Sequence, residues 1–120
     1  MPQILIVDDE PTVHALLSRS FTRAGYGVMT ASSALEAITL CGANPFDAIL
    51  SDVDMPKMNG HELARWVAIN HPDMRCVLMS GFSLECEQCP LVGRCLLLRK
   101  PFAGTEAVAV ITDLLRQRSN

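Results

Sequence analysis

The chain has 120 residues, of which 49% are hydrophobic and 19% charged, a balance typical of one globular domain rather than of a disordered chain. Thirteen acidic side chains against ten basic ones give a net charge of −3, which argues against direct binding to nucleic acid or to an anionic membrane. We therefore expect a single domain over residues 1–120 that has neither of these partners.

Targeting and membrane-spanning patterns are not evident in the sequence. The apolar run near the N-terminus is about five residues long, has no basic leader and continues into carboxylates, unlike a signal peptide. Other apolar runs also fall short of the ~20 residues that cross a bilayer. We therefore expect a cytoplasmic protein, whose thiols stay reduced and whose five cysteines do not form a disulfide framework.

The first strand and helix are predicted from residues 3–7 (QILIV) and from the segment that begins at Pro11. The continuous apolar run is typical of a strand covered on both faces. Pro11 is a good first helical residue, and Gly25 marks the end of the helix. The apolar stripe of this helix consists of Val13, Leu16, Leu17 and Phe21.

A second strand and helix follow. Residues 27–31 (GVMTA) predict the strand. The helix after it is capped by Ser32 or Ser33 and ends near residues 42–45. Its large apolar residues are Leu35 and Ile38.

The second half of the chain repeats this alternation. Residues 46–52 (FDAILSD) predict a third buried strand, and a loop containing Pro56 and Gly60 leads to a helix over residues 61–71. Further strands are predicted at residues 75–80 and 95–98, and a last helix runs from about residue 103 to 118, with Val108, Ile111, Leu114 and Leu115 as its apolar stripe. Strands alternating with helices indicate a doubly wound α/β domain, with a parallel sheet and helices on both faces.

Polar side chains gather where the predicted strands end, the edge at which such sheets bind ligands. Asp8 and Asp9 follow the first strand, Asp52 ends the third, and Ser80 and Lys100 come at the ends of the fourth and fifth. Three carboxylates in one crevice repel one another, and Mg²⁺ would relieve that conflict because it prefers oxygen ligands. Each residue alone has an ordinary structural explanation, but together they suit phosphoryl transfer.

The sequence resembles the receiver domain of two-component response regulators over essentially its whole length. The motifs that carry the resemblance are ILIVDDEP (4–11), DAILSDVDMPKMNGHEL (47–63), VLMSG (77–81) and RKPF (99–102). The resemblance implies a flavodoxin-like fold, with a five-stranded parallel sheet in the order 2-1-3-4-5 counted along the chain.

The resemblance also implies the roles of the acidic residues. Asp52 would be the phosphoacceptor. Asp8, Asp9 and Asp52 would hold Mg²⁺ together with the backbone carbonyl of Asp54. The phosphorylation would therefore depend on Mg²⁺.

The same resemblance assigns the remaining site residues and the partners. Ser80 would bind a phosphoryl oxygen, and Lys100 would pair with the phosphoryl or carboxylate charge. A sensor histidine kinase or phosphotransfer protein would supply the phosphoryl group, and an unknown downstream protein would bind the switched face. Such a domain is a signalling module, not an enzyme with a separate substrate. We expect either a stand-alone receiver or the receiver part of a larger protein.

Two features depart from the family pattern. Leu97 occupies the position at which the family usually has the Phe or Tyr of a rotamer switch. Between Ser80 and Lys100, where the family has its fourth helix, Pro90 and Gly93 interrupt the sequence. We therefore expect this helix to be irregular or short.

Three cysteines in this segment form a C-x2-C-x5-C pattern: Cys86, Cys89 and Cys95. They could pack as reduced thiols, form a functional disulfide or bind a metal. A closed zinc site needs a fourth ligand, and Cys41 and Cys76 are expected to be buried elsewhere. One alternative is therefore a degenerate receiver that acts as a redox-sensing or metal-sensing interaction module.

A second alternative is a phosphohydrolase, since Asp52 and Asp54 form a D-x-D pattern at a strand end. Hydrolases of that type carry the motif on their first strand, whereas here it follows the third. The histidines, His14, His61 and His71, lie on predicted helices without ligand spacing. We expect them to be solvated.

Overall fold

The computed structural model describes residues 2–53, 58–80, 95–99 and 102–118. The elements in these ranges are β1 (Gln3–Val7), α1 (Pro11–Arg23), β2 (Gly27–Ala31), α2 (Ala34–Ala43), β3 (Ala48–Asp52), α3 (Gly60–Asn70), β4 (Arg75–Ser80), β5 (Cys95–Arg99) and α4 (Gly104–Arg118). Within the same ranges, none of the helices has the length and apolar character needed to cross a membrane.

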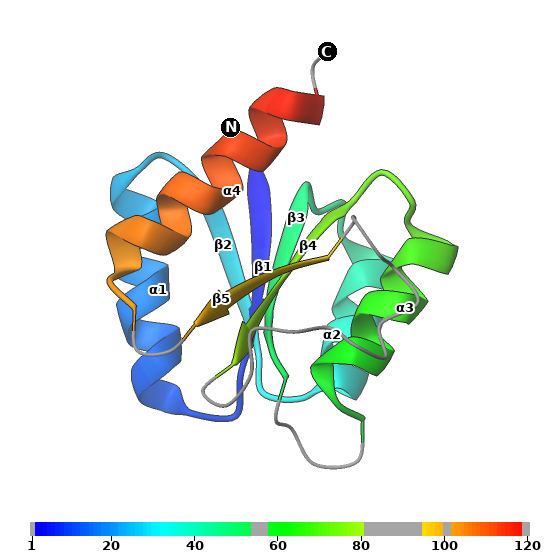
Figure 1. Ribbon diagram of the computed structural model, residues 1–120. Helices are drawn as coiled ribbons and strands as arrows, with labels where there is room; N and C mark the ends of the chain where they lie inside the picture. Colours follow the sequence, from blue (N-terminus) through cyan, green and yellow to red (C-terminus); the bar gives the residue numbers. More distant parts are fainter. Residues whose placement is uncertain (1, 54–57, 81–94, 100–101, 119–120) are drawn as a thin grey trace.

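The strands form one parallel sheet in the order β2-β1-β3-β4-β5, which is the order that the resemblance implies (Figure 1). β1 lies between β2 and β3, and its last residue, Val7, pairs with both Ala31 and Ser51. The strand order reverses between β1 and β3, so the ends of these two strands flank the crevice where sheets of this type bind ligands. The irregular helix expected before β5 falls in residues 81–94, outside the described residues.

The helix starts are fixed by local sequence signals. α1 begins at Pro11, and Gly25 adopts a φ of 94° in the turn that follows the helix. The Ser33 hydroxyl accepts the backbone N–H of Glu36 and caps α2, so Ser33 is the cap of the two serines considered. Asn59 forms a capping box with Glu62 at the start of α3.

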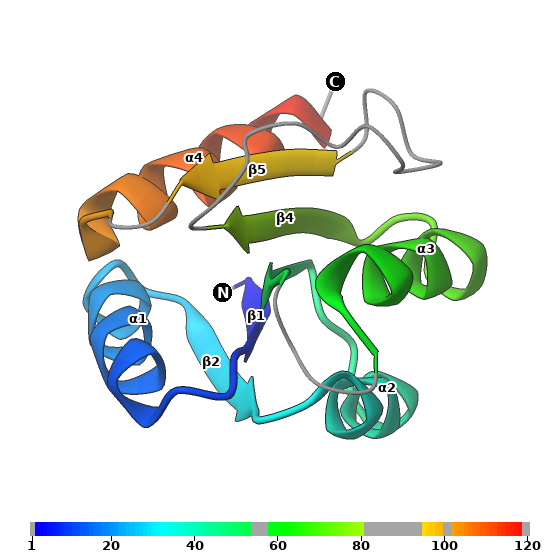
Figure 2. The same cartoon turned by 60° about the horizontal axis from the view of Figure 1, so that its bottom comes forward.

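Two hydrophobic layers cover the sheet, one on each face. α1 and α4 lie on one side and α2 and α3 on the other (Figure 2). Along β1, Ile4 and Ile6 pack in the layer with α1 and α4, whereas Leu5 and Val7 pack in the layer with α2 and α3. The strand is therefore buried on both faces, which explains why its apolar run is continuous rather than alternating.

The apolar stripes expected on two helices are only partly right. On α1, Leu17 and Phe21 are fully buried but Leu16 is 48% exposed. On α2, Leu35 is 54% exposed, and the helix instead buries the small residues Ala34, Ala37 and Cys41. Small side chains let α2 lie close to the sheet, so the helix turns its small residues inward rather than its largest apolar one.

Candidate functional site

The turn after β1 is held by hydrogen bonds around Asp8. The backbone N–H of Asp8 donates to the Ala31 carbonyl of β2 at 3.1 Å. The Asp8 Oδ1 accepts the backbone N–H of Glu10 at 2.9 Å. Asp8 is fully buried, whereas Asp9 next to it is exposed. These bonds fix the direction in which the chain leaves the sheet before α1 begins at Pro11.

The end of β3 is held between β4 and the start of α3. Asp52 is the last residue of the strand and is only 5% exposed. The next residue, Val53, donates its N–H to the Met79 carbonyl at 2.9 Å and accepts the N–H of Gly60 at 3.0 Å. A Cβ at residue 60 would overlap the Asp52 carbonyl and lie 2.9 Å from the Val53 Cα. A glycine is therefore required where α3 meets this strand end.

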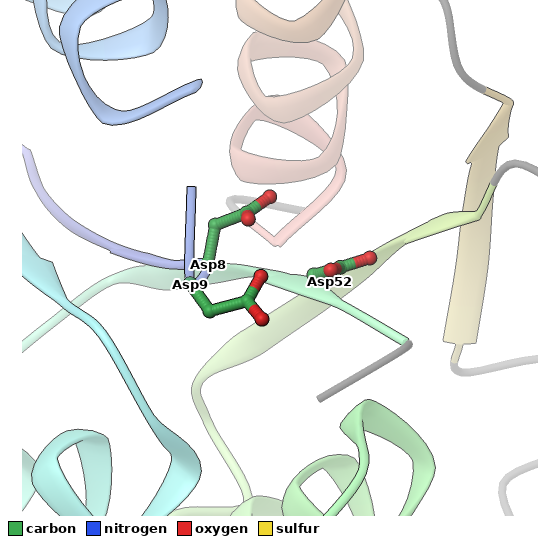
Figure 3. Close-up of side chains that lie close together, drawn as sticks. All are labelled: Asp8, Asp9 and Asp52. Carbon is green, nitrogen blue, oxygen red and sulfur yellow. The ribbon is translucent and has the colours of Figure 1, made fainter. Parts of the chain in front are cut away.

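The side chains of Asp8, Asp9 and Asp52 converge at the ends of β1 and β3 (Figure 3). One carboxylate oxygen from each lies within 4.8 Å of the others. The register explains the meeting, because Val7 pairs with Ser51 and the residue after each of them is an aspartate. Like charges this close repel one another unless a cation or protons compensate.

The donor set suits a small divalent cation. All three side chains offer carboxylate oxygens, which are the ligands that Mg²⁺ prefers, and two of them come from the buried residues Asp8 and Asp52. No thiol or imidazole belongs to this cluster, so the chemistry of the described donors favours Mg²⁺ over a softer metal such as zinc.

Of the other expected site residues, the structure describes Ser80. Ser80 ends β4 and is 5% exposed, so it lies at the same edge of the sheet as Asp52. Its backbone pairs with Arg99, the residue before Lys100. Asp54 and Lys100 themselves lie outside the described residues.

The cysteine pattern is described only in part. Cys86 and Cys89 lie outside the described residues, and Cys95 is placed as the first residue of β5 without a description of its side chain. Cys41 and Cys76 are buried, as expected from the sequence. Burial raises the pKa of the Cys41 thiol, which keeps it neutral at ordinary pH.

Two contacts near the site were missed by reasoning from sequence. His14 on α1 is half-buried, and its Nε2 lies 3.1 Å from the Ala31 carbonyl that also accepts the Asp8 N–H, so the expectation of a solvated His14 was wrong. The close approach of Gly60 to β3 was also missed. The position of Gly60 directly after a capping Asn59 is the signal that could have suggested a tight helix start.

A large hollow lies away from the candidate site. It has a volume of about 830 Å³ and is formed by the connections that precede β3 and β4. Its lining includes Cys41, Phe46, Asp47, His71 and Met74. These residues lie at the amino ends of the strands, opposite the carboxylate cluster, so the hollow is separate from the candidate site.

Comparison with known proteins identifies the family. The model of the response regulator receiver domain matches residues 4–112. Response regulator MprA of Mycobacterium sp. (strain KMS) is 34% identical over 119 residues, covering 98% of this chain and 52% of the relative. The chain thus spans about half the length of this relative.

Solved structures agree with the family model. The chemotaxis response regulator CheY4 of Vibrio cholerae matches with a TM-score of 0.85 and 30% identity, covering 95% of this chain and 98% of that one. A CheY-like response regulator receiver domain protein from Methanospirillum hungatei JF-1 matches with a TM-score of 0.91 and 26% identity, covering 99% and 97%. The family model, the relative and the shared fold all lead to one conclusion: the chain belongs to the response regulator receiver domain family.

Proposed function

We propose that this chain is the phosphoacceptor module of a two-component system and that Asp52 receives the phosphoryl group. The observation that carries the proposal is the convergence of Asp8, Asp9 and Asp52, with an oxygen of each within 4.8 Å of the others. Of the two buried members, Asp52 lies at the end of β3, between the acidic turn and Ser80 on β4. An acceptor there can be reached by an electrophile and flanked by groups from both neighbouring strands.

Asp8, Asp9 and Asp52, with the backbone carbonyl of Asp54, would hold Mg²⁺. When bound, Mg²⁺ offsets the repulsion between the carboxylates and an incoming phosphoryl group and stabilises charge on the phosphoryl oxygens. The hydrogen bond from the Glu10 N–H to Asp8 keeps that carboxylate oriented before any ligand arrives.

The chain's own residues carry out the transfer. A carboxylate oxygen of Asp52 attacks the phosphorus of a phosphohistidine on a histidine kinase or phosphotransfer protein. As the new P–O bond forms, the P–N bond breaks, and the donor histidine keeps the electron pair and takes up a proton. The product is an aspartyl phosphate, which is a mixed anhydride.

Ser80 and Lys100 act on the transferred group. The Ser80 hydroxyl donates a hydrogen bond to a phosphoryl oxygen, and the Lys100 ammonium pairs with its negative charge. Because Ser80 ends β4 and Lys100 comes directly after β5 in the sequence, their movement toward the phosphate shifts the packing of that side of the domain. A change of this kind alters which downstream protein the domain binds.

The substitution Asp52→Asn tests the assignment. The asparagine keeps the size of the side chain but lacks the nucleophilic carboxylate, so we expect Mg²⁺-dependent labelling by acetyl phosphate to disappear. Intact-protein mass spectrometry measures the label, and Asp47→Asn, a matched change just before β3, serves as the control. Persistent labelling of Asp52→Asn would refute the proposal.

The alternatives have less support. A D-x-D phosphohydrolase would release many phosphates per chain, whereas the proposed receiver takes up one, so counting turnover separates the two. The relatives and solved structures described above are response regulators and receiver domains, which favours single uptake. The redox or metal-sensing module would depend on Cys86, Cys89 and Cys95, whose side chains the structure does not describe.

A further inference from the structure

One buried polar side chain has no part in the proposed transfer. The buried polar residues of the described chain are Asp8, Ser51, Asp52 and Ser80. Ser51 is the member without a role, although it precedes the acceptor directly and is 0% exposed. A hydroxyl hidden from water is unfavourable unless it is hydrogen-bonded, so its presence in a buried strand needs an explanation.

The neighbours of Ser51 on the two adjoining strands are apolar. Its strand neighbours are Val7 on β1 and Leu78 on β4, and both belong to the hydrophobic layer with α2 and α3. The Ser51 hydroxyl donates to the backbone carbonyl of Asp52 at 3.1 Å, and this bond is buried. The hydroxyl thus holds the peptide unit between Asp52, the proposed phosphoacceptor, and Val53.

The same carbonyl is restricted from a second direction. Gly60, at the start of α3, approaches the Asp52 carbonyl so closely that a Cβ at residue 60 would overlap it. The direction of this carbonyl is defined by the ψ torsion of Asp52, which is the rotation about the bond from its Cα to its carbonyl carbon. The side chain with the phosphoacceptor carboxylate is attached to the same Cα. A hydroxyl that fixes the carbonyl therefore also limits how the carboxylate can turn.

We propose that Ser51 is a positioning residue, whose hydroxyl holds the Asp52 peptide unit so that the acceptor carboxylate is oriented toward the crevice before a phosphoryl donor binds. The proposal rests on the function proposed above and adds a residue that acts through Asp52 without touching the phosphoryl group. Loss of the bond widens the range of carboxylate orientations, and a reaction that requires one orientation slows accordingly.

The test compares three variants of the full chain: Ser51→Ala, Ser51→Cys and Ser51→Thr. Labelling rates are measured at saturating Mg²⁺ over a range of acetyl phosphate concentrations. We expect Ser51→Ala to lower the maximal rate by about three- to tenfold, the factor that one ordinary hydrogen bond gives, without a change in KM. Ser51→Cys, a weak donor of similar size, stays slow, whereas Ser51→Thr, which keeps the hydroxyl, recovers most of the rate.

A second readout separates positioning from stability. Urea unfolding of each variant gives its free energy of unfolding, and calorimetry gives its Mg²⁺ affinity in the absence of phosphoryl donor. We expect the Mg²⁺ affinity of Ser51→Ala to fall as well, because one of the coordinating carboxylates is less ordered. Thr39→Ala is the matched control, since Thr39 donates to the Leu35 carbonyl at 3.1 Å on the exposed side of α2, and its removal leaves labelling unchanged.

The outcomes distinguish the two proposals. If the wild-type chain is not labelled, the proposed function fails and the role of Ser51 fails with it. If the wild-type chain is labelled and either Ser51→Ala or Ser51→Cys matches its rate, the positioning role alone is overturned, and Ser51 only fills space in the strand.

Discussion

The two ends of the sheet contain carboxylates in different situations. At the carboxyl ends of β1 and β3, the side chains of Asp8, Asp9 and Asp52 lie close together, with one oxygen of each within 4.8 Å of the others. At the amino ends, Asp47 lies beside the 830 Å³ hollow, and its Oδ2 accepts the backbone N–H of Gln3 at 2.8 Å. The hollow thus has a carboxylate bonded to the backbone, whereas the crowded acids lie at the end where we propose that the reaction takes place. Under the proposed function, the converging carboxylates locate the site and the hollow does not.

Removing one of the crowded acids gives the largest expected effect. In Asp8→Asn, the amide oxygen can still accept the Glu10 N–H, but one negative charge is lost. We expect the Mg²⁺ affinity to fall by about a hundredfold or more. Without Mg²⁺, the free energy of unfolding should rise by about 1 kcal/mol, because a repulsion is relieved.

Calorimetry with Mg²⁺ and urea unfolding in the presence of a chelator measure these two effects. Undiminished Mg²⁺ binding by Asp8→Asn would show that the crowded acids are not the ion's ligands. An unchanged stability without Mg²⁺ would show that their repulsion is already compensated within the protein.

Two glycine-to-alanine changes compare the carboxyl end of the sheet with the hollow at the amino end. Gly60→Ala forces a methyl group against the Asp52 carbonyl, so we expect a loss of about 1–3 kcal/mol in stability and slower labelling. Gly42→Ala, in α2 beside the hollow, meets open space and should instead add about 0.5–1 kcal/mol. Urea unfolding and acetyl phosphate labelling are measured for both variants. If both substitutions change the free energy of unfolding by the same amount and in the same direction, the close contact at Gly60 is contradicted.

The carboxylate beside the hollow should matter for stability alone. Asp47→Ala removes the acceptor for the Gln3 N–H, which we expect to cost about 1–2 kcal/mol of unfolding free energy. Mg²⁺ affinity and labelling of the folded variant should match those of the wild type. A large drop in either would mean that the two ends of β3 are coupled.

The smallest effect is expected from the thiol that lines the hollow. Burial raises the pKa of Cys41 above its ordinary value of 9.0, so the unfolded chain loses this proton at a lower pH than the folded chain does. The stability is fully present below that value and falls as the pH rises from there toward the raised pKa. Urea unfolding under reducing conditions between about pH 8 and pH 10 measures the slope, and Cys41→Ala should reduce it. An identical slope in the variant would contradict the buried thiol as its source.

Much of the fold could be predicted because its strands are short apolar runs that end in polar residues. QILIV followed by Asp8 and Asp9 already indicates both the buried strand and the acidic turn at its end. The faces that the helices bury against the sheet were harder to predict. Leu16 and Leu35 are exposed, because the face that a helix turns inward depends on how closely it can approach the sheet. That distance is a property of the packed structure rather than of one helix.

The candidate site, too, has features that the sequence predicted and contacts that only the structure revealed. The strand pattern predicted that Asp8 and Asp52 would meet at the carboxyl edge of the sheet, but the register between β1 and β3 that brings them together is known only from the structure. The contacts of His14 with Ala31 and of Gly60 with Asp52 were missed, since each depends on how closely a helix packs against the strand next to it in the chain. Ser51 was visible as a polar residue in a buried strand, but its bond to the carbonyl of Asp52 is known only from the structure.

The pairing of Val7 with Ser51 determines at which stage of folding the domain could first be phosphorylated. Residues 8 and 52 have no reason to meet in an unfolded chain, and a slip of one residue would send every side chain of a strand to the opposite face. Under the proposed function, a newly made chain therefore cannot receive a signal until its central strands have aligned. Chains in which these strands are misaligned would then not be phosphorylated, and so would not activate the downstream protein.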